Sequence, residues 1–156
     1  MRQWGSTMNR MIKIIVIICV ALIISGFVIW DVPRNQVVLY LEKEKIEQTA
    51  HAYLRAEIEK ETKQVYDLLA PSSDYRKSHT YEAYLKDIAD NPSPAIRTYR
   101  IIRIDRLRDN DNRQNYPNVD KFVQVEVEVT FSHSGPNMIY NYCFTFLKEQ
   151  GRWYKG

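Results

Sequence analysis

Four consecutive side chains that carry oxygen ligands stand at positions 109–112, which read Asp-Asn-Asp-Asn. Calcium prefers carboxylate and amide oxygens, so this run is the first candidate for a metal site. A calcium-binding loop also needs a glycine at its sixth position and a glutamate at its end. Gln114 and Asp120 occupy those two positions here. The sequence therefore favours a solvated hairpin loop over a calcium site.

Histidine and cysteine offer no second metal candidate. His51, His79 and His133 lie far apart in the sequence, whereas paired zinc ligands are commonly about three to five residues apart. Cys19 lies within the apolar N-terminal run and is far from Cys143. We therefore expect no metal, no cofactor and no disulfide between these two cysteines.

A series of arginines follows one predicted strand, at Arg97, Arg100, Arg103, Arg106 and Arg108. Phosphate or nucleic-acid binding is one interpretation of such a series. The other is cross-strand pairing with Glu126 and Glu128. All 19 acidic residues follow position 30, as do all of the 22 basic residues except Arg2, Arg10 and Lys13. Because the chain beyond position 30 is formally neutral, the sequence favours pairing, and we expect no nucleic-acid partner.

An apolar run at residues 11–30 reads MIKIIVIICVALIISGFVIW and has no charge after Lys13. A helix of about 20 residues spans about 30 Å, the thickness of the hydrocarbon core. The basic residues before the run predict a cytoplasmic N-terminus. We expect a cytoplasmic tail at 1–10, a single transmembrane helix at 11–30 in contact with lipid of the inner (plasma) membrane, and a periplasmic or extracellular C-terminal domain. A cleaved signal peptide is the alternative, but the run is long and no A-x-A-like site follows.

The next part of the chain has helical periodicity. Residues 31–43 form a juxtamembrane link or a helix extension, and a long helical stretch covers about 36–70 with a break near Glu61 and Thr62, where Thr62 is the expected N-cap. A further helix is predicted at 80–90, capped by Thr80. The charged side of the long stretch is predicted to face solvent and contains Glu42, Lys43, Glu44, Lys45, Glu57, Glu59, Lys60 and Glu61.

From residue 96 the pattern changes to extended structure. Strands are predicted at 96–108, 119–132, 138–148 and 152–155, with a turn at 134–137. Strict alternation fails at Ile101-Ile102 and Phe122-Val123, which predicts β-bulges. Helices followed by a meander of antiparallel strands indicate an α+β fold, with helices packed on a curved sheet of about four strands.

Three short segments resemble those of the nuclear-transport-factor-2-like superfamily, which is also called ketosteroid-isomerase-like or cystatin-like. Residues 65–72 (VYDLLAPS) look like the end of its second helix, 81–88 (YEAYLKDI) like its third, and 151–154 (GRWY) like its closing hairpin. The resemblance covers residues 44–156 and implies a cone in which the sheet wraps the helices, often around a pocket. Membrane-anchored members of type IV secretion machines have a similar layout.

The family's isomerases use a buried carboxylate near hydrogen-bond donors, which makes Asp67, Asp74 and Asp105 the acids to consider. Their simpler interpretation is surface charge, so we expect no catalytic residue. Aromatic side chains are the expected contacts for a ligand or partner: Tyr66, Tyr84, Tyr140, Tyr142, Phe144 and Trp153.

The sequence thus predicts a membrane-anchored extracytoplasmic binding or scaffold module without enzymatic activity, in a setting such as an envelope or secretion assembly. Its partner would be a protein or a second copy of the chain. A cone-fold enzyme of isomerase or dehydratase type, acting on an apolar small molecule, is the alternative, and an inhibitor or immunity-like protein is a third.

Overall fold

The computed structural model describes residues 4–132 and 138–156, but among the first 35 residues it describes the side chains of only 16–20 and Arg34. Contacts divide the chain into two compact units, Met1–Val38 and Leu39–Gly156. The elements are α1 (Trp4–Glu59), α2 (Thr62–Leu68), α3 (Asp74–Ser78), α4 (Tyr81–Asp90), β1 (Ile96–Asp109), β2 (Val119–Phe131), β3 (Tyr140–Glu149) and β4 (Arg152–Lys155). This is the α+β class that the sequence predicts.

From Trp4 onward, the first unit is helical and belongs to α1. Within the part of the chain that the structure describes, no helix combines the length and apolar character of a membrane span. The predicted transmembrane segment 11–30 falls mostly outside that part, because only the side chains of 16–20 are described there. The membrane anchor therefore stays a prediction. The segment 31–43, for which the sequence left two possibilities, is helical.

Helix α1 ends where the sequence predicts a break. Lys60 adopts a left-handed backbone conformation, with φ of 58°, which a helix cannot continue through. Thr62 is the first residue of α2 and Glu61 its N-cap, which makes no side-chain capping bond. The predicted capping role of Thr62 is wrong, because its hydroxyl lies 3.2 Å from that of Tyr81 instead.

The next two helices have side-chain caps. Thr80 accepts a hydrogen bond from the Ala83 amide and caps α4, as the sequence predicts. Ser73 does the same for α3 through the Arg76 amide. The sequence analysis missed α3, because five residues are too few to show a helical period.

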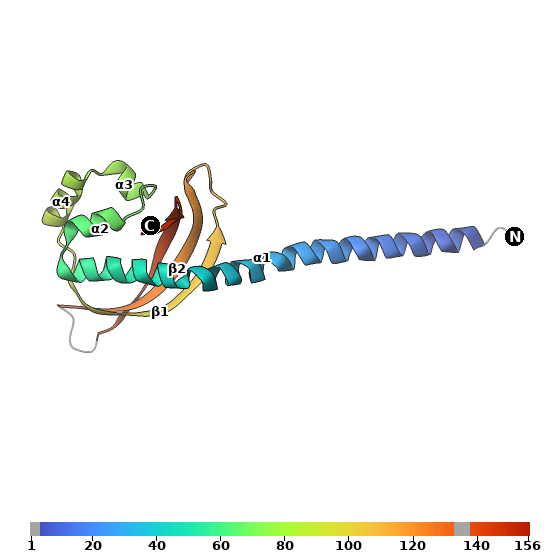
Figure 1. Cartoon of the computed structure of the whole chain (residues 1–156), viewed down its shortest axis with the longest axis horizontal. Coiled ribbons are helices and arrows are strands. Elements are labelled where there is room, and N and C mark those ends of the chain that lie inside the picture. The colour runs from blue at the N-terminus through green and yellow to red at the C-terminus, as the bar shows by residue number, and fades with distance from the viewer. Residues whose placement is uncertain (1–3, 133–137) are drawn as a thin grey trace. The chain divides into compact units, whose positions relative to one another are not determined.

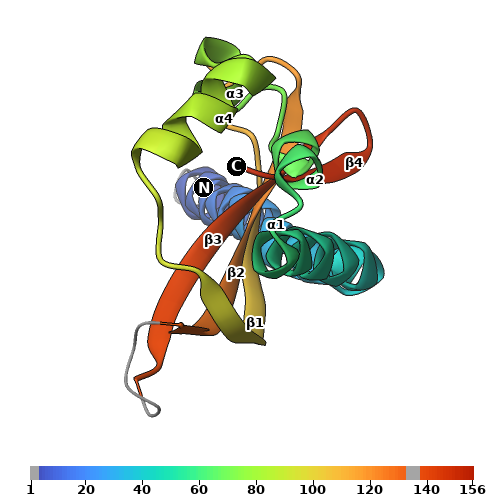
Figure 2. The same cartoon turned by 90° about the vertical axis from the view of Figure 1, so that its left-hand side faces the viewer.

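The four strands form one antiparallel sheet in the order β1-β2-β3-β4, and the long strands bend along their length (Figure 1, Figure 2). A register shift between Ile101 and Arg103 confirms the bulge predicted there. An irregularity is also present at Phe122-Val123, where the pairing with β1 shifts register between Asp105 and Arg108. In contrast, Phe122 and Val123 both continue a regular ladder with β3. Both are apolar because each face is covered at this point. The turn predicted at 134–137 lies outside the described residues.

The part of α1 that belongs to the second unit, from Leu39 to Glu59, packs on one face of the sheet, which we call the helix face. Its Ile46, Ala50 and Leu54 side chains are completely buried. Alternate residues of β2 on the same face are also fully or almost fully buried: Val123, Val125, Val127 and Val129. Burying a side chain of this size contributes about 1.5–3 kcal/mol, so these residues are a large part of the apolar core.

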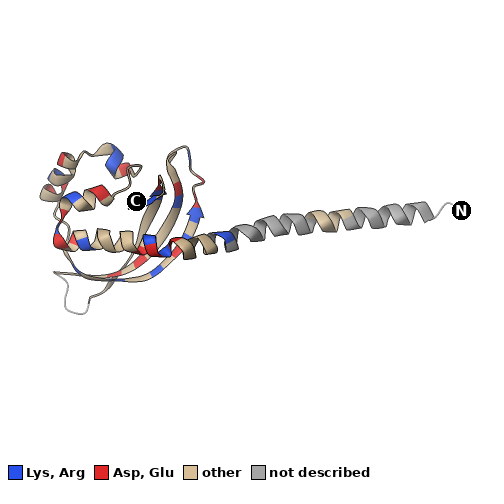
Figure 3. Cartoon of the chain, viewed as in Figure 1, with Lys and Arg blue, Asp and Glu red and all other residues tan. Residues whose placement is uncertain are grey.

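The opposite face of the sheet carries cross-strand ion pairs. Arg100 Nη2 lies 2.7 Å from Glu128 Oε2, and Arg103 Nη2 lies 2.9 Å from Glu126 Oε2. Figure 3 shows the two charge signs mixed over the sheet, with no region of a single sign. The predicted pairing with Glu126 and Glu128 is confirmed for Arg100 and Arg103.

The loop at 109–118 is organised by Asn110, whose buried amide group donates to the carbonyls of Tyr116 and Val119. Its side-chain oxygen accepts from the Asn112 amide at 2.9 Å. Among the described residues, no group of three or more His, Cys, Asp or Glu side chains is placed to hold a metal ion.

Candidate binding site

The exposed aromatic residues that the sequence singled out come together at the beginning of β3. Tyr140, Tyr142 and Phe144 point to the helix face, opposite Val129, Val127 and Val125 of β2. The Tyr142 and Phe144 rings are stacked, with centroids 6.0 Å apart. Phe131 packs against Tyr140 and Tyr142 at 5.5 and 5.9 Å. The result is a continuous aromatic row, which we call the β3 aromatic row (Phe131, Tyr140, Tyr142 and Phe144).

This row is only half covered. Tyr140 and Tyr142 remain 40% and 41% exposed, although the β2 valines beside them are buried. The neighbouring Met138 and Ile139 are 56% and 60% exposed. Helix α1 covers the row only at its inner end, where the Tyr53 and Phe144 rings lie 6.2 Å apart. A contiguous apolar surface of this kind marks a site of interaction.

The backbone of β3 is also open over the same residues. Strand β4 pairs with β3 only from Phe146 to Glu149, and the Gly156 amide adds one bond to the Thr145 carbonyl at 2.9 Å. Residues Tyr140 to Phe144 therefore have β2 on one side and, among the described residues, no strand on the other. We call this segment the open edge.

The direction of the backbone groups on the open edge follows from that bond to Thr145. Successive residues of a strand direct their N–H and C=O groups to alternate sides. Since Thr145 faces outward, Cys143 and Asn141 also face outward, and Tyr142 faces β2. Two amide donors and two carbonyl acceptors are thus presented to a partner.

Trp153 lies elsewhere, at the closed end of the sheet. It is 5% exposed, and its indole N–H donates to Glu42 Oε2 of α1 at 2.8 Å. Lys148 forms an ion pair with the other oxygen of Glu42. The sequence placed Glu42 on a solvated helix face, which is wrong, because this carboxylate holds α1 to β3 and β4.

The ionisation of Glu42 reflects these contacts. Burial alone would raise its pKa, but the hydrogen bonds from Lys148 and Trp153 and the charge of Lys148 lower the pKa of this carboxyl below its ordinary value. The charged carboxylate is therefore the form that the fold stabilises.

Tyr66 and Tyr84 belong to a third group, on the helices. Their rings lie 5.5 Å apart, and Tyr81 and Tyr75 extend the group. Tyr66 is almost fully buried and donates its hydroxyl to the His79 carbonyl at 2.8 Å. The structure thus separates the six predicted contact residues into a set on β3, the buried Tyr66 and Trp153, and the half-buried Tyr84.

A cavity of about 310 Å³ lies between the ends of α1, α2 and α4 and the segment that leads into β1. Glu57 and Tyr84 supply polar groups to it, and Val65 and Ile88 are among its apolar walls. Glu57 Oε1 accepts a hydrogen bond from the Tyr53 hydroxyl at 2.7 Å. The predicted solvent exposure of Glu57 is therefore wrong.

Burial raises the pKa of the Tyr53 phenol, and the charge of Glu57 adds to this shift. The same two causes raise the pKa of Tyr84 to about 12. Burial lowers the pKa of Lys155, and the charge of Glu57 opposes that shift. Lys155 lies over the Tyr53 and Phe144 rings, at 5.9 and 5.7 Å from their centroids. Both tyrosines therefore stay protonated at neutral pH and act as hydrogen-bond donors.

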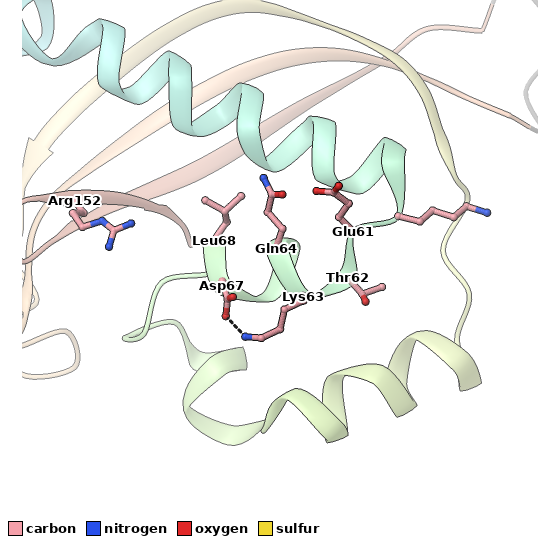
Figure 4. Close-up of a pocket in the computed structure, with 8 residues that line it drawn as sticks. Glu61, Thr62, Lys63, Gln64, Asp67, Leu68 and Arg152 are labelled. Atoms are coloured by element: carbon pink, nitrogen blue, oxygen red, sulfur yellow. Dashed lines mark hydrogen bonds and ion pairs between the residues drawn. The ribbon is translucent and has the colours of Figure 1, made fainter.

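The three acids suggested by the family resemblance are all engaged away from this cavity. Asp74 accepts from the Tyr116 hydroxyl at 3.3 Å, and Asp105 pairs with Arg103 at 3.0 Å. Asp67 pairs with Lys63 at 2.6 Å, on the wall of an open surface hollow of about 560 Å³ that Arg152 also lines (Figure 4). The carboxylate that lines the partly open cavity between α1, α2 and α4 is Glu57, which sequence reasoning missed.

The signal for this group was present as the spacing of Tyr53 and Glu57, four residues apart on one helix face. The sequence analysis instead assigns Glu57 to the charged, solvent-facing side of the helix. No protein-family model matches the chain, and no curated protein shows detectable similarity to it.

Proposed function

We propose that this protein is a membrane-anchored extracytoplasmic binding or scaffold module of the nuclear-transport-factor-2-like kind, within an envelope or secretion assembly. The observation that carries the proposal is the open edge of β3, Tyr140 to Phe144. Among the described residues, its outward backbone groups have no partner strand, and the half-exposed rings of Tyr140 and Tyr142 belong to the same segment.

Both features fit recognition of an extended segment. A free strand edge binds a further strand through main-chain hydrogen bonds, and side-chain pockets or aromatic surfaces add specificity. Natural proteins protect free edges with charge, proline or covering elements. The sequence YNYCF of the open edge contains no charge and no proline. This combination favours an edge that binds a partner strand over an edge that is protected against pairing.

The anchor supports the same function. The apolar run 11–30 and the basic residues before it support a location of the domain outside the cytoplasm and close to the membrane surface. Tethering raises the effective concentration of the domain for partners in the same membrane. A small binding edge is sufficient under that condition.

The test uses the full chain in the membrane of cells that produce it. A photo-crosslinking amino acid, p-benzoylphenylalanine, replaces Tyr142 in one variant and Ile102 in a matched control. The two side chains have similar exposure, 41% and 43%, but Ile102 lies on β1. We expect a covalent adduct of defined mass from position 142 and none from position 102.

Absence of an adduct from position 142, or equal adducts from both positions, would contradict the proposal. Protease added to intact spheroplasts checks the topology. It should digest the domain while leaving a cytoplasmic control protein intact.

A second candidate is an enzyme of the isomerase or dehydratase type, which the cavity beside Glu57 favours. A carboxylate that accepts from one tyrosine and lies near a second protonated tyrosine is a suitable general base and donor pair for proton transfer next to a carbonyl. Its test is exchange of the α-protons of 2-tetralone in D₂O, followed by NMR, with the wild-type chain and with Glu57→Gln. Equal exchange rates in the two proteins would remove this candidate.

A further inference from the structure

We infer that the occupant of the open edge is the open edge of a second copy of this chain. The two β3 strands pair antiparallel about a two-fold axis at Tyr142. This inference rests on the proposed function, because it names the partner of the same edge.

Charge separates this edge from the other edge of the sheet. Strand β1, at the opposite side, carries the five arginines and two aspartates, so a second β1 would bring like charges together. The open edge has no charged residue from Tyr140 to Phe144. A second copy therefore meets no charged side chain among these five residues.

The hydrogen-bond pattern selects one register. Asn141 and Cys143 face outward, while the outward carbonyl of Thr145 is already bonded to Gly156. An antiparallel pair joins outward-facing residues. Among pairings confined to Tyr140–Phe144, the pairing of Asn141 with the second copy's Cys143, and the reverse, is the one that uses all four groups without involving Thr145. This register is symmetric and places Tyr142 opposite itself.

The same register places aromatic side chains opposite one another on the helix face. Tyr142 meets Tyr142, and Tyr140 meets Phe144, in both directions. Residues opposite each other at non-hydrogen-bonded positions have Cα atoms about 4.5 Å apart, the closest approach in a sheet. Aromatic pairs at such positions stabilise strand pairing. The side chains that are half exposed in one copy would thus be covered by the other.

The contact is small, because five residues of each copy take part. Interfaces that hold without further support usually bury more than about 1,000 Å². Pairing therefore depends on the concentration of the chain in the membrane, and dilution into excess detergent or lipid should separate the copies.

Substitutions on the opposite face of the sheet test the register. In the inferred pair, Asn141 lies opposite Cys143 of the second copy. The double change Asn141→Lys with Cys143→Lys places lysines opposite each other twice, whereas Asn141→Lys with Cys143→Glu places a lysine opposite a glutamate twice. Both variants change the same two exposed positions.

Self-association of the full chain is measured by energy transfer between labelled copies in lipid vesicles of phosphatidylcholine, as the lipid-to-protein ratio is varied. We expect the Lys/Lys variant to weaken association by about tenfold and the Lys/Glu variant to restore it. Circular dichroism verifies that both variants remain folded. Equal association of the two variants would overturn the register.

Cysteine crosslinking gives a second, independent measurement in a background with Cys19→Ala and Cys143→Ser. Tyr142→Cys should form a disulfide-linked dimer under mild oxidation, since directly opposite Cα atoms are within disulfide range. Asn141→Cys in the same background should not form this dimer. When Cys143 is retained, Asn141→Cys should form a disulfide with Cys143 of the second copy. Crosslinking from Asn141→Cys alone, or none from Tyr142→Cys, would contradict the inferred pair.

The two proposals fail differently. If the photo-crosslinked adduct from position 142 has a mass other than twice that of the chain, the edge is a binding site for another protein and only the self-pairing inference is lost. If no adduct forms, both are lost.

Discussion

The two halves of β3 belong to one continuous strand but have different surroundings. From Phe146 to Glu149 the strand is paired on both edges, and Phe146 is 1% exposed. From Tyr140 to Phe144 it is paired on one edge, and Tyr142 is 41% exposed. The first region serves the fold of the chain. The second retains the same capacity for pairing and burial, and this is why we assign it the partner.

Replacing Phe146 with alanine should give the largest change in stability. Removing a fully buried phenylalanine costs about 3–5 kcal/mol, whereas Tyr142→Ala should cost about 1 kcal/mol or less. Chemical unfolding of the full chain in detergent micelles, at a concentration where it is monomeric, measures both. A similar loss of stability in the two variants would mean that the halves of β3 do not differ as described.

The Glu42 contacts hold α1 to the half of β3 that is paired on both edges. Their loss should therefore have the next largest effect on stability. Glu42→Ala leaves the Trp153 N–H and the half-buried Lys148 ammonium without their partner. We expect a loss of about 2–3 kcal/mol in the free energy of unfolding. The matched control is Glu44→Ala, an exposed residue of the same helix, which should change stability by about 0.5 kcal/mol or less.

The contribution of Glu42 should also depend on pH. Its pKa in the folded chain is below the ordinary value of 4.5, so its charged form stabilises the fold at any pH above about 4.5. As pH falls through the folded-state pKa, this contribution disappears. The stability difference between the wild type and Glu42→Gln should be constant from about pH 6 to pH 8 and shrink below about pH 4.5. A difference that grows on acidification would contradict the assignment.

Lys155 lies at the boundary between the two halves and should give the smallest effect. Burial lowers its pKa below 10.5, so at neutral pH the folded chain is destabilised by keeping the amine charged. Lys155→Met should be neutral or slightly stabilising at pH 7. As pH rises from the folded-state pKa to 10.5, the wild type should gain stability relative to this variant. Thermal unfolding at several pH values measures the difference.

The sequence predicted the elements well because their signals are local. The valines of β2, the Thr80 cap of α4 and the break before α2 were all read from spacing and residue type. Cross-strand pairing of Arg100 and Arg103 with glutamates followed from the alternation of β2. Helix α3 was missed, because so short a helix has no period to recognise.

The candidate site was predicted only in part, because the exposure of a side chain depends on the tertiary fold. Tyr142 and Trp153 have the same aromatic character in the sequence, but one is half exposed and the other is bonded to Glu42. Glu42 and Glu57 belong to a charged run that is typical of a solvated helix. Which members of that run face the sheet is decided by contacts from residues about 100 positions away, and no local pattern records them.

The central claim is that the first half of β3 is an unfinished edge that a second copy completes. Residue-resolved amide hydrogen exchange of the full chain in micelles tests it most directly. In the dissociated chain, the Asn141 and Cys143 amides should exchange rapidly and the Tyr142 amide slowly, because only Tyr142 faces β2. Raising the ratio of protein to detergent should slow exchange at Asn141 and Cys143. If these two amides were already protected in the dissociated chain, or remained unprotected at every ratio, the account would be wrong.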